Sequence, residues 1–198
     1  AEEPAAEAVA RRAAWEETPG VDVAKVRAAK KIKEEADEAF KSALFEKGAA
    51  LYSKALETLG FEEDTAAEQA VCCLNRAACN LQVREYGQVI ADCGQVLDWD
   101  ADNVTAYLRR GLAYEGSRRF SKAAADMREV LSIQSASGGL RDTQAKKAKE
   151  CLERCVKAEP DLQAIPIPSR ARITPPAHQQ HPETIVVDTW EAPDESAA

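Results

Sequence analysis

Two stretches of the chain, starting at Ala70 and at Val104, show the same order of small and large side chains at an offset of 34 residues. A third stretch starting at Ala29 shows the pattern again, and its offset from the second is longer by seven residues near positions 61–65. A period of this length indicates an array of stacked units, each of which covers its apolar face with a neighbour. We therefore expect a repeat array and not a single central core.

The units are expected to be helical. Apolar residues recur at three- and four-residue spacing, and no window shows sustained alternation with a period of two. Between Pro19 and Pro160 the chain contains no proline, so helices can run without interruption. Abundant alanine favours helices that pack closely against one another. The sequence predicts an all-α fold with helices over residues 7–17, 21–44, 47–59, 66–83, 86–97, 105–116, 120–133 and 142–158, and a loop over 135–139.

Composition divides the chain into three parts. Residues 1–20 are predicted to form an N-terminal helical extension that ends at a Thr-Pro-Gly sequence. Residues 21–159 form the repeat domain, with units at about 29–69, 70–103 and 104–137 and a capping helix at 142–158. From Pro160 onward seven prolines occur, so residues 160–198 are expected to be an extended, proline-rich tail that is disordered alone.

The pattern of the units resembles the tetratricopeptide repeat (TPR) family over about residues 29–158. That family places small residues where the two helices of a unit approach each other and large residues in the gap to the next unit. The resemblance implies a superhelix of three helix-turn-helix repeats with a capping helix. The matching residues are Ala36, Phe40, Phe45, Gly48, Tyr52 and Ala55 in the first unit, Ala77, Tyr86, Val89, Cys93 and Val96 in the second, and Gly111, Tyr114, Phe120, Ala123, Met127 and Val130 in the third.

The resemblance also implies a binding site. Three-repeat domains of this family commonly bind the acidic C-terminus of heat-shock chaperones of the seventy- and ninety-kilodalton classes through a dicarboxylate clamp. Cationic and amide donors of the clamp bind the two carboxylates of a terminal aspartate. The five clamp positions in chain order are Lys33, Asp37, Asn75, Thr105 and Arg109. Lys33, Asn75 and Arg109 match the family. The other two depart from it, because Asp37 replaces an asparagine and Thr105 replaces a lysine.

The two departures leave more than one interpretation. Asp37 places a third carboxylate beside those of the ligand, and like charges about 4 Å apart repel by roughly 1–4 kcal/mol. Thr105 removes one cation. The site is then a clamp that is weakened or adapted to another C-terminus, or Lys33, Asn75 and Arg109 are scaffold residues with Asp37 in an internal ion pair. Binding of another peptide, or of the chain's own tail, is a further alternative.

Six cysteines stand among alanine, leucine and valine on predicted helices, where cysteine behaves as a small hydrophobic residue. We expect reduced, buried thiols and therefore a reducing, cytoplasmic compartment. Cys151 and Cys155 are four residues apart on one helix face. Because no histidine and no second cysteine pair is near them, a zinc site is not expected, nor is any other metal or cofactor.

Several classes of function are disfavoured. A net charge of −8 and a pI of about 5.0 argue against nucleic-acid binding. No apolar run approaches the length of a membrane-spanning helix, so no membrane insertion is expected, and no signal peptide is apparent. The histidines, His178 and His181, lie in the predicted tail, and neither a glycine-rich phosphate loop nor a nucleophile elbow is present. We expect the chain not to be an enzyme.

Two functions remain. The first is a protein-interaction adaptor, co-chaperone-like, that binds a peptide or C-terminal tail in the concave groove of the repeats. The alternative is a structural subunit of a large cytoskeletal, ciliary or organellar assembly that docks through its N-terminal helix and tail. Trp15 and Trp190 are candidate anchors on a partner, whereas Trp99 is expected to pack between repeats.

Overall fold

The computed structural model describes residues 23–60, 65–137 and 142–164. Within these residues the backbone is helical and forms no strand, which confirms the all-α prediction. The elements in chain order are α2 (Val23–Lys41), α3 (Phe45–Leu59), α4 (Ala66–Gln82), α5 (Tyr86–Trp99), α6 (Val104–Gly116), α7 (Phe120–Ser137), α8 (Asp142–Ala158) and the 3-10 helix η3 (Pro160–Ala164).

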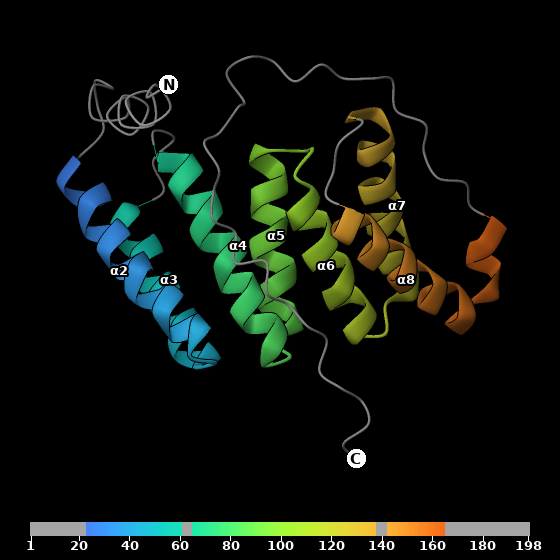
Figure 1. Ribbon diagram of the computed structural model, residues 1–198, viewed down its shortest axis with the longest axis horizontal. Helices are drawn as coiled ribbons and strands as arrows, with labels where there is room; N and C mark the ends of the chain where they lie inside the picture. Colours follow the sequence, from blue (N-terminus) through green and yellow to red (C-terminus); the bar gives the residue numbers. More distant parts are fainter. Residues whose placement is uncertain (1–22, 61–64, 138–141, 165–198) are drawn as a thin grey trace, which may run out of the picture.

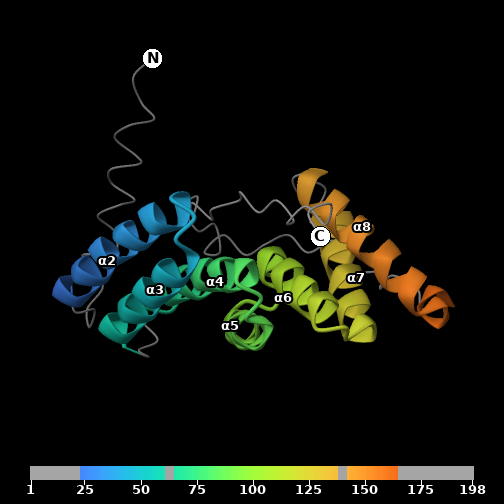
Figure 2. The same ribbon diagram turned by 90° about the horizontal axis from the view of Figure 1, so that it is seen from below.

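The helices are arranged as a row of antiparallel pairs (Figure 1), and the row bends into an arch (Figure 2). Each helix packs against the next one in the chain. The first helices of the units also contact one another, α2 with α4 and α4 with α6, and α6 contacts α8. Figure 2 shows α5 on the convex side of the arch. The first helices of the units and the capping helix therefore line the inner side.

The turns between the two helices of each unit confirm the repeat register. Ala43, Arg84 and Arg118 have positive φ angles of 56°, 61° and 60°. They are separated along the chain by the same offsets as the three sequence windows. The residue after each one donates its N–H to a carbonyl five residues earlier, as in Leu44 N to Ala39 O at 2.9 Å. This left-handed helix stop has the form that glycine usually supplies.

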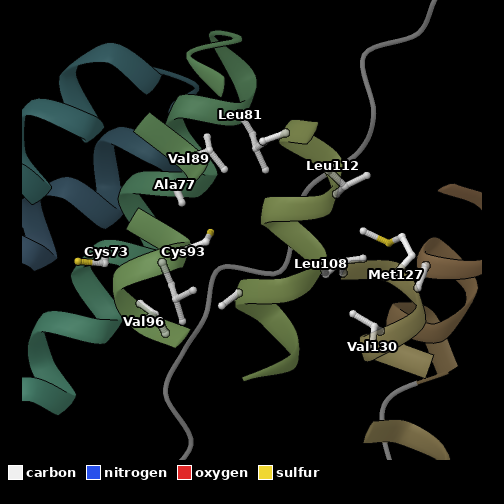
Figure 3. Packing of buried hydrophobic residues seen from close by; sticks show 14 of the residues in the cluster. Cys73, Ala77, Leu81, Val89, Cys93, Val96, Leu108, Leu112, Met127 and Val130 are labelled. Carbon is white, nitrogen blue, oxygen red and sulfur yellow. The ribbon is translucent and has the colours of Figure 1, made fainter. Parts of the chain in front are cut away.

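Small residues let the helices approach, as the sequence predicted. A Cβ added at Gly111 of α6 would overlap Met127 Cε of α7, and one at Gly48 of α3 would lie 3.0 Å from Cys79 Sγ of α4. Large side chains fill the spaces between units, and the ring of Tyr86 fills the space beside Gly116. Figure 3 shows the buried side chains of α4 to α7 as one continuous core.

Two ion pairs occupy equivalent positions in the second and third units. Arg76 of α4 donates to Asp92 of α5 through Nε at 2.9 Å and Nη2 at 2.6 Å. Arg110 of α6 makes the same two bonds to Asp126 of α7, both at 2.8 Å. Burial raises the pKa of each aspartate, and the paired arginine opposes the shift. In both units a bidentate ion pair therefore joins the first helix to the second.

The structure corrects four predictions. Helix α2 ends at Lys41, so residues 42–44, predicted as the end of a helix over 21–44, form the turn before α3. Helix α7 runs to Ser137, into the predicted loop at 135–139. Residues 160–164, predicted as extended tail, form η3 because a proline is tolerated at the first position of a helix. Leu162 of η3 is buried and its carbonyl accepts a hydrogen bond from Arg128, so the domain continues to residue 164. Trp99, expected to pack between repeats, leaves 41% of its surface exposed at the end of α5.

The predicted helix at 7–17 and residues 165–198 of the predicted tail lie outside the described residues. In the described part of the chain, no helix is both long enough and apolar enough to cross a membrane.

Candidate functional site

Donors from three helices converge on the carboxylate of Asp37. Lys33 lies one turn earlier on α2, and its Nζ is 2.7 Å from Asp37 Oδ2. The hydroxyl of Tyr52, on α3, donates to Asp37 Oδ1. Asn75 Nδ2, on α4, lies 3.5 Å from the same oxygen. We call these four residues the Asp37 cluster.

The Asp37 cluster has a buried base and a partly exposed rim. Tyr52 and Asn75 are 0% and 1% exposed, whereas the side chains of Lys33 and Asp37 are 23% and 19% exposed. Burial, followed by the hydrogen bond to Asp37, raises the pKa of Tyr52 above its ordinary value, so its hydroxyl remains a donor. Asn75 Oδ1 is buried and meets no hydrogen-bond partner among the described residues.

The two other predicted clamp residues have different partners. Arg109 of α6 is 7% exposed, and its Nη1 donates to the carbonyl of Leu74 on α4 at 2.7 Å. Thr105 Oγ1 accepts a hydrogen bond of 3.3 Å from Gln144 Nε2 on the capping helix α8. The structure therefore brings Lys33, Asp37 and Asn75 together. Arg109 joins the second repeat to the third, and Thr105 joins the third repeat to the cap.

The sequence analysis placed Tyr52 in the repeat pattern but did not assign it to the site. A signal was present, because Tyr52 occupies the position held by Cys93 and Met127 in the other units. Asp37 likewise occupies the position held by Ala78 and Leu112. Two polar exceptions at core positions of one unit indicate that they pair with each other.

A separate hollow of about 350 Å³ lies between α2 and α3. It shares no residue with the Asp37 cluster. Its lining is mixed and includes the 51% exposed Leu44; the lining residues are Glu35, Glu38, Ala39, Ser42, Leu44, Lys47 and Leu51. The predicted anchors Trp15 and Trp190 lie outside the described residues, so docking through them stays a prediction.

The sequence is similar to parts of larger proteins. No protein-family model matches it. A segment of 95 residues is 35% identical to the Hsp70/Hsp90 co-chaperone cns1 of Schizosaccharomyces pombe and covers 48% of this chain and 26% of cns1. A segment of 98 residues is 32% identical to the human mitochondrial import receptor subunit TOM34 and covers 49% of this chain and 32% of TOM34. The chain thus corresponds to about a quarter to a third of these relatives.

Among solved structures, the TPR domain of OM64 from Arabidopsis matches the fold with a TM-score of 0.56 and 32% sequence identity. The match covers 67% of this chain and 98% of that domain. Similarity to a whole TPR domain at this identity, on the predicted repeat register, shows that the chain belongs to the tetratricopeptide repeat family.

Proposed function

We propose that this chain is a protein-interaction adaptor that binds the C-terminal end of a partner protein on the inner side of α2, α4 and α6. The Asp37 cluster carries the proposal, because donors from three helices there already hold one carboxylate. Such charge-assisted hydrogen bonds are the interactions that a terminal carboxylate requires. The names of cns1, a co-chaperone, and TOM34, an import receptor subunit, support a binding role and not a catalytic one.

The first candidate partner is the acidic C-terminus of a chaperone of the Hsp70 or Hsp90 class, since cns1 is named as a co-chaperone of both. An ammonium group has three N–H donors, so Lys33 can bind a ligand carboxylate while it keeps its contact with Asp37. The partial exposure of Lys33 lets a ligand reach it. The site thus offers a cation at the surface above a buried amide and hydroxyl.

Asp37 is expected to weaken such a complex. Its carboxylate uses donors that a ligand would take, and it repels the ligand by roughly 1–4 kcal/mol at a separation of about 4 Å. Asp37→Asn keeps an acceptor for Tyr52 and removes the charge. We therefore expect this substitution to increase affinity for an acidic C-terminus by tenfold or more.

The test is a fluorescence-anisotropy titration of the full chain with a peptide ending in Glu-Glu-Val-Asp. The same peptide with an amidated C-terminus is the ligand control. Asp37→Asn should bind more tightly than the natural sequence, and Lys33→Ala should bind at least tenfold more weakly. Lys31→Ala, an exposed lysine of α2 outside the cluster, should change little. Circular dichroism verifies that each variant is folded.

Equal binding of the free and amidated peptides would show that the terminal carboxylate is not recognised. If Asp37→Asn fails to bind at millimolar peptide, the acidic C-terminus is rejected as a ligand. Tight binding that is unaffected by Lys33→Ala would place the peptide elsewhere on the chain.

A further inference from the structure

A second convergence of polar side chains lies between α6 and the capping helix α8, outside the Asp37 cluster. Cys151 and Cys155 stand one turn apart on α8 and are both 0% exposed. Glu115, near the end of α6, reaches them across the helix interface. The two sulfur atoms and one carboxylate oxygen all lie within 4.8 Å of one another, and Cys151 Sγ is 3.0 Å from Glu115 Oε2.

We propose that Glu115, Cys151 and Cys155 form a three-ligand site for a thiophilic divalent cation, with Zn²⁺ as the best fit and water as the fourth ligand. Zinc binds thiolate at about 2.3 Å and carboxylate oxygen at about 2.0–2.2 Å. Two sulfur ligands of one tetrahedral ion are then about 3.8 Å apart. Side-chain rotations that draw the three atoms slightly closer complete the site.

A shared ion suits this pair of cysteines better than a disulfide does. Residues four apart on a helix have Cβ atoms about 5–6 Å apart. A disulfide requires about 3.5–4.5 Å, so it would distort α8. An ion that bridges two sulfurs leaves the helix intact.

The charges balance with and without the ion. In the ion-free cluster the Cys151 thiol donates to Glu115, whose carboxylate is paired with Arg154 through Nε at 2.5 Å and Nη2 at 2.9 Å. On binding, each thiol releases a proton, and two thiolates, one carboxylate, one Zn²⁺ and the Arg154 guanidinium sum to zero. Burial therefore leaves no net charge uncompensated.

The ion has a path to the site. The Arg154 side chain is 53% exposed and that of Glu115 is 18% exposed, whereas the two cysteines are fully buried. An ion that meets Glu115 at the surface can pass to the sulfurs as Arg154 moves aside. Once bound, it joins α6 to α8 and fastens the capping helix to the third repeat.

The test uses the full chain, reduced and freed of metal, and titrates it with Co²⁺ as a spectroscopic probe for Zn²⁺. We expect one tetrahedral Co²⁺ per chain, with a thiolate-to-cobalt charge-transfer band that Zn²⁺ abolishes. Cys151→Ser and Cys155→Ser should each lose the band, and Glu115→Gln should bind at least tenfold more weakly. Cys73→Ser is the matched control and should retain the band, because Cys73 is a buried thiol of α4 that lies outside the site and contacts Gln95 Oε1 at 3.8 Å.

A measurement on the unaltered chain guards against variants that fail to fold. Zinc at a hundredfold excess over its Kd should raise the melting temperature of the natural sequence and not that of Cys151→Ser. The proposal is overturned if no charge-transfer band forms with excess Co²⁺. It is equally overturned if the band survives both serine substitutions or is lost in Cys73→Ser alone.

Discussion

In the second and third repeats an arginine of the first helix pairs with an aspartate of the second, whereas the first repeat holds Glu35 and Leu51 at these positions. The absence of the pair coincides with the hollow, which both residues line. The polar contact of the first repeat lies instead at Asp37 and Tyr52, positions that are apolar in the other repeats.

The backbone register is therefore the same in all three units while the polar chemistry differs. In each Arg–Asp pair the guanidinium meets one carboxylate within its own unit, and Arg76 also donates to Ser53 Oγ of the first unit at 2.9 Å. The Asp37 cluster draws on α2, α3 and α4 and has a rim at the surface. A regular pair serves the scaffold, whereas an irregular and partly exposed cluster is the better candidate for recognition.

The largest expected change in stability comes from four buried thiols of the second repeat. The first repeat contains no cysteine. Burial raises the pKa of each to about 12, above the ordinary value of 9.0; the thiols are Cys72, Cys73, Cys79 and Cys93. As the pH rises the unfolded chain loses these protons first. The contribution of these protonated thiols to the free energy of unfolding is therefore complete below pH 9 and is lost between pH 9 and 12.

Once the unfolded thiols are ionised, each thiol should lower the free energy of unfolding by about 1.4 kcal/mol per pH unit, and all four together by roughly 5–6 kcal/mol per pH unit. Urea unfolding at pH 8, 9 and 10 measures this dependence. Cys93→Ala should reduce the slope by about a quarter. A urea midpoint that stays constant from pH 8 to 10 would contradict the prediction.

The next largest change in stability tests whether the Arg–Asp ion pair of the second repeat can be replaced by the leucine that the first repeat has at the same position. Arg76→Met leaves Asp92, whose side chain is 3% exposed, buried without its cation, and should lower the free energy of unfolding by about 3–5 kcal/mol. The double variant Arg76→Met, Asp92→Leu places leucine where the first repeat has Leu51 and should recover most of that loss. Chemical denaturation of the three chains tests this, and a double variant no more stable than Arg76→Met would show that leucine cannot replace the pair.

The smallest effect concerns the contact between the two helices of a unit. Gly111→Ala should lower the free energy of unfolding by about 1–3 kcal/mol, because its Cβ would overlap Met127. The second repeat has Ala77 with Cys93 at these positions, so Gly111→Ala with Met127→Cys should recover stability.

The control for this prediction is Gly94→Ala on α5, where an added Cβ meets no atom within 4 Å. It should stabilise the chain by about 0.5–1 kcal/mol through helix propensity alone. Thermal melts that rank Gly111→Ala as equal to Gly94→Ala would show that the close approach at Gly111 carries no cost.

Most helices could be predicted from the sequence because their signals are local. The bounds of α8 match the predicted 142–158, and α4 differs from its prediction by one residue. One prediction was wrong because a contact with a distant element decided the conformation. Residues 160–164 form η3 because Leu162 packs into the core and bonds to Arg128, which no pattern within the tail indicates.

The candidate site was predicted in part. The repeat register placed Lys33, Asp37 and Asn75 on helices that face one side, and the internal ion pair of Lys33 with Asp37 was among the open alternatives. The contribution of Tyr52 and the burial of Arg109 were not predicted, since both depend on how far a side chain reaches across a helix interface.

The sequence by itself determined the all-helical fold and the repeat register, because spacing along the chain encodes which face of a helix is apolar. Only the tertiary structure decided that Asp37 meets donors from three helices and that Glu115 reaches Cys151 and Cys155. Glu115 and Cys151 are 36 residues apart in the chain. A contact across such a separation forms only when packing brings two helices together, and that packing depends on all the units between them.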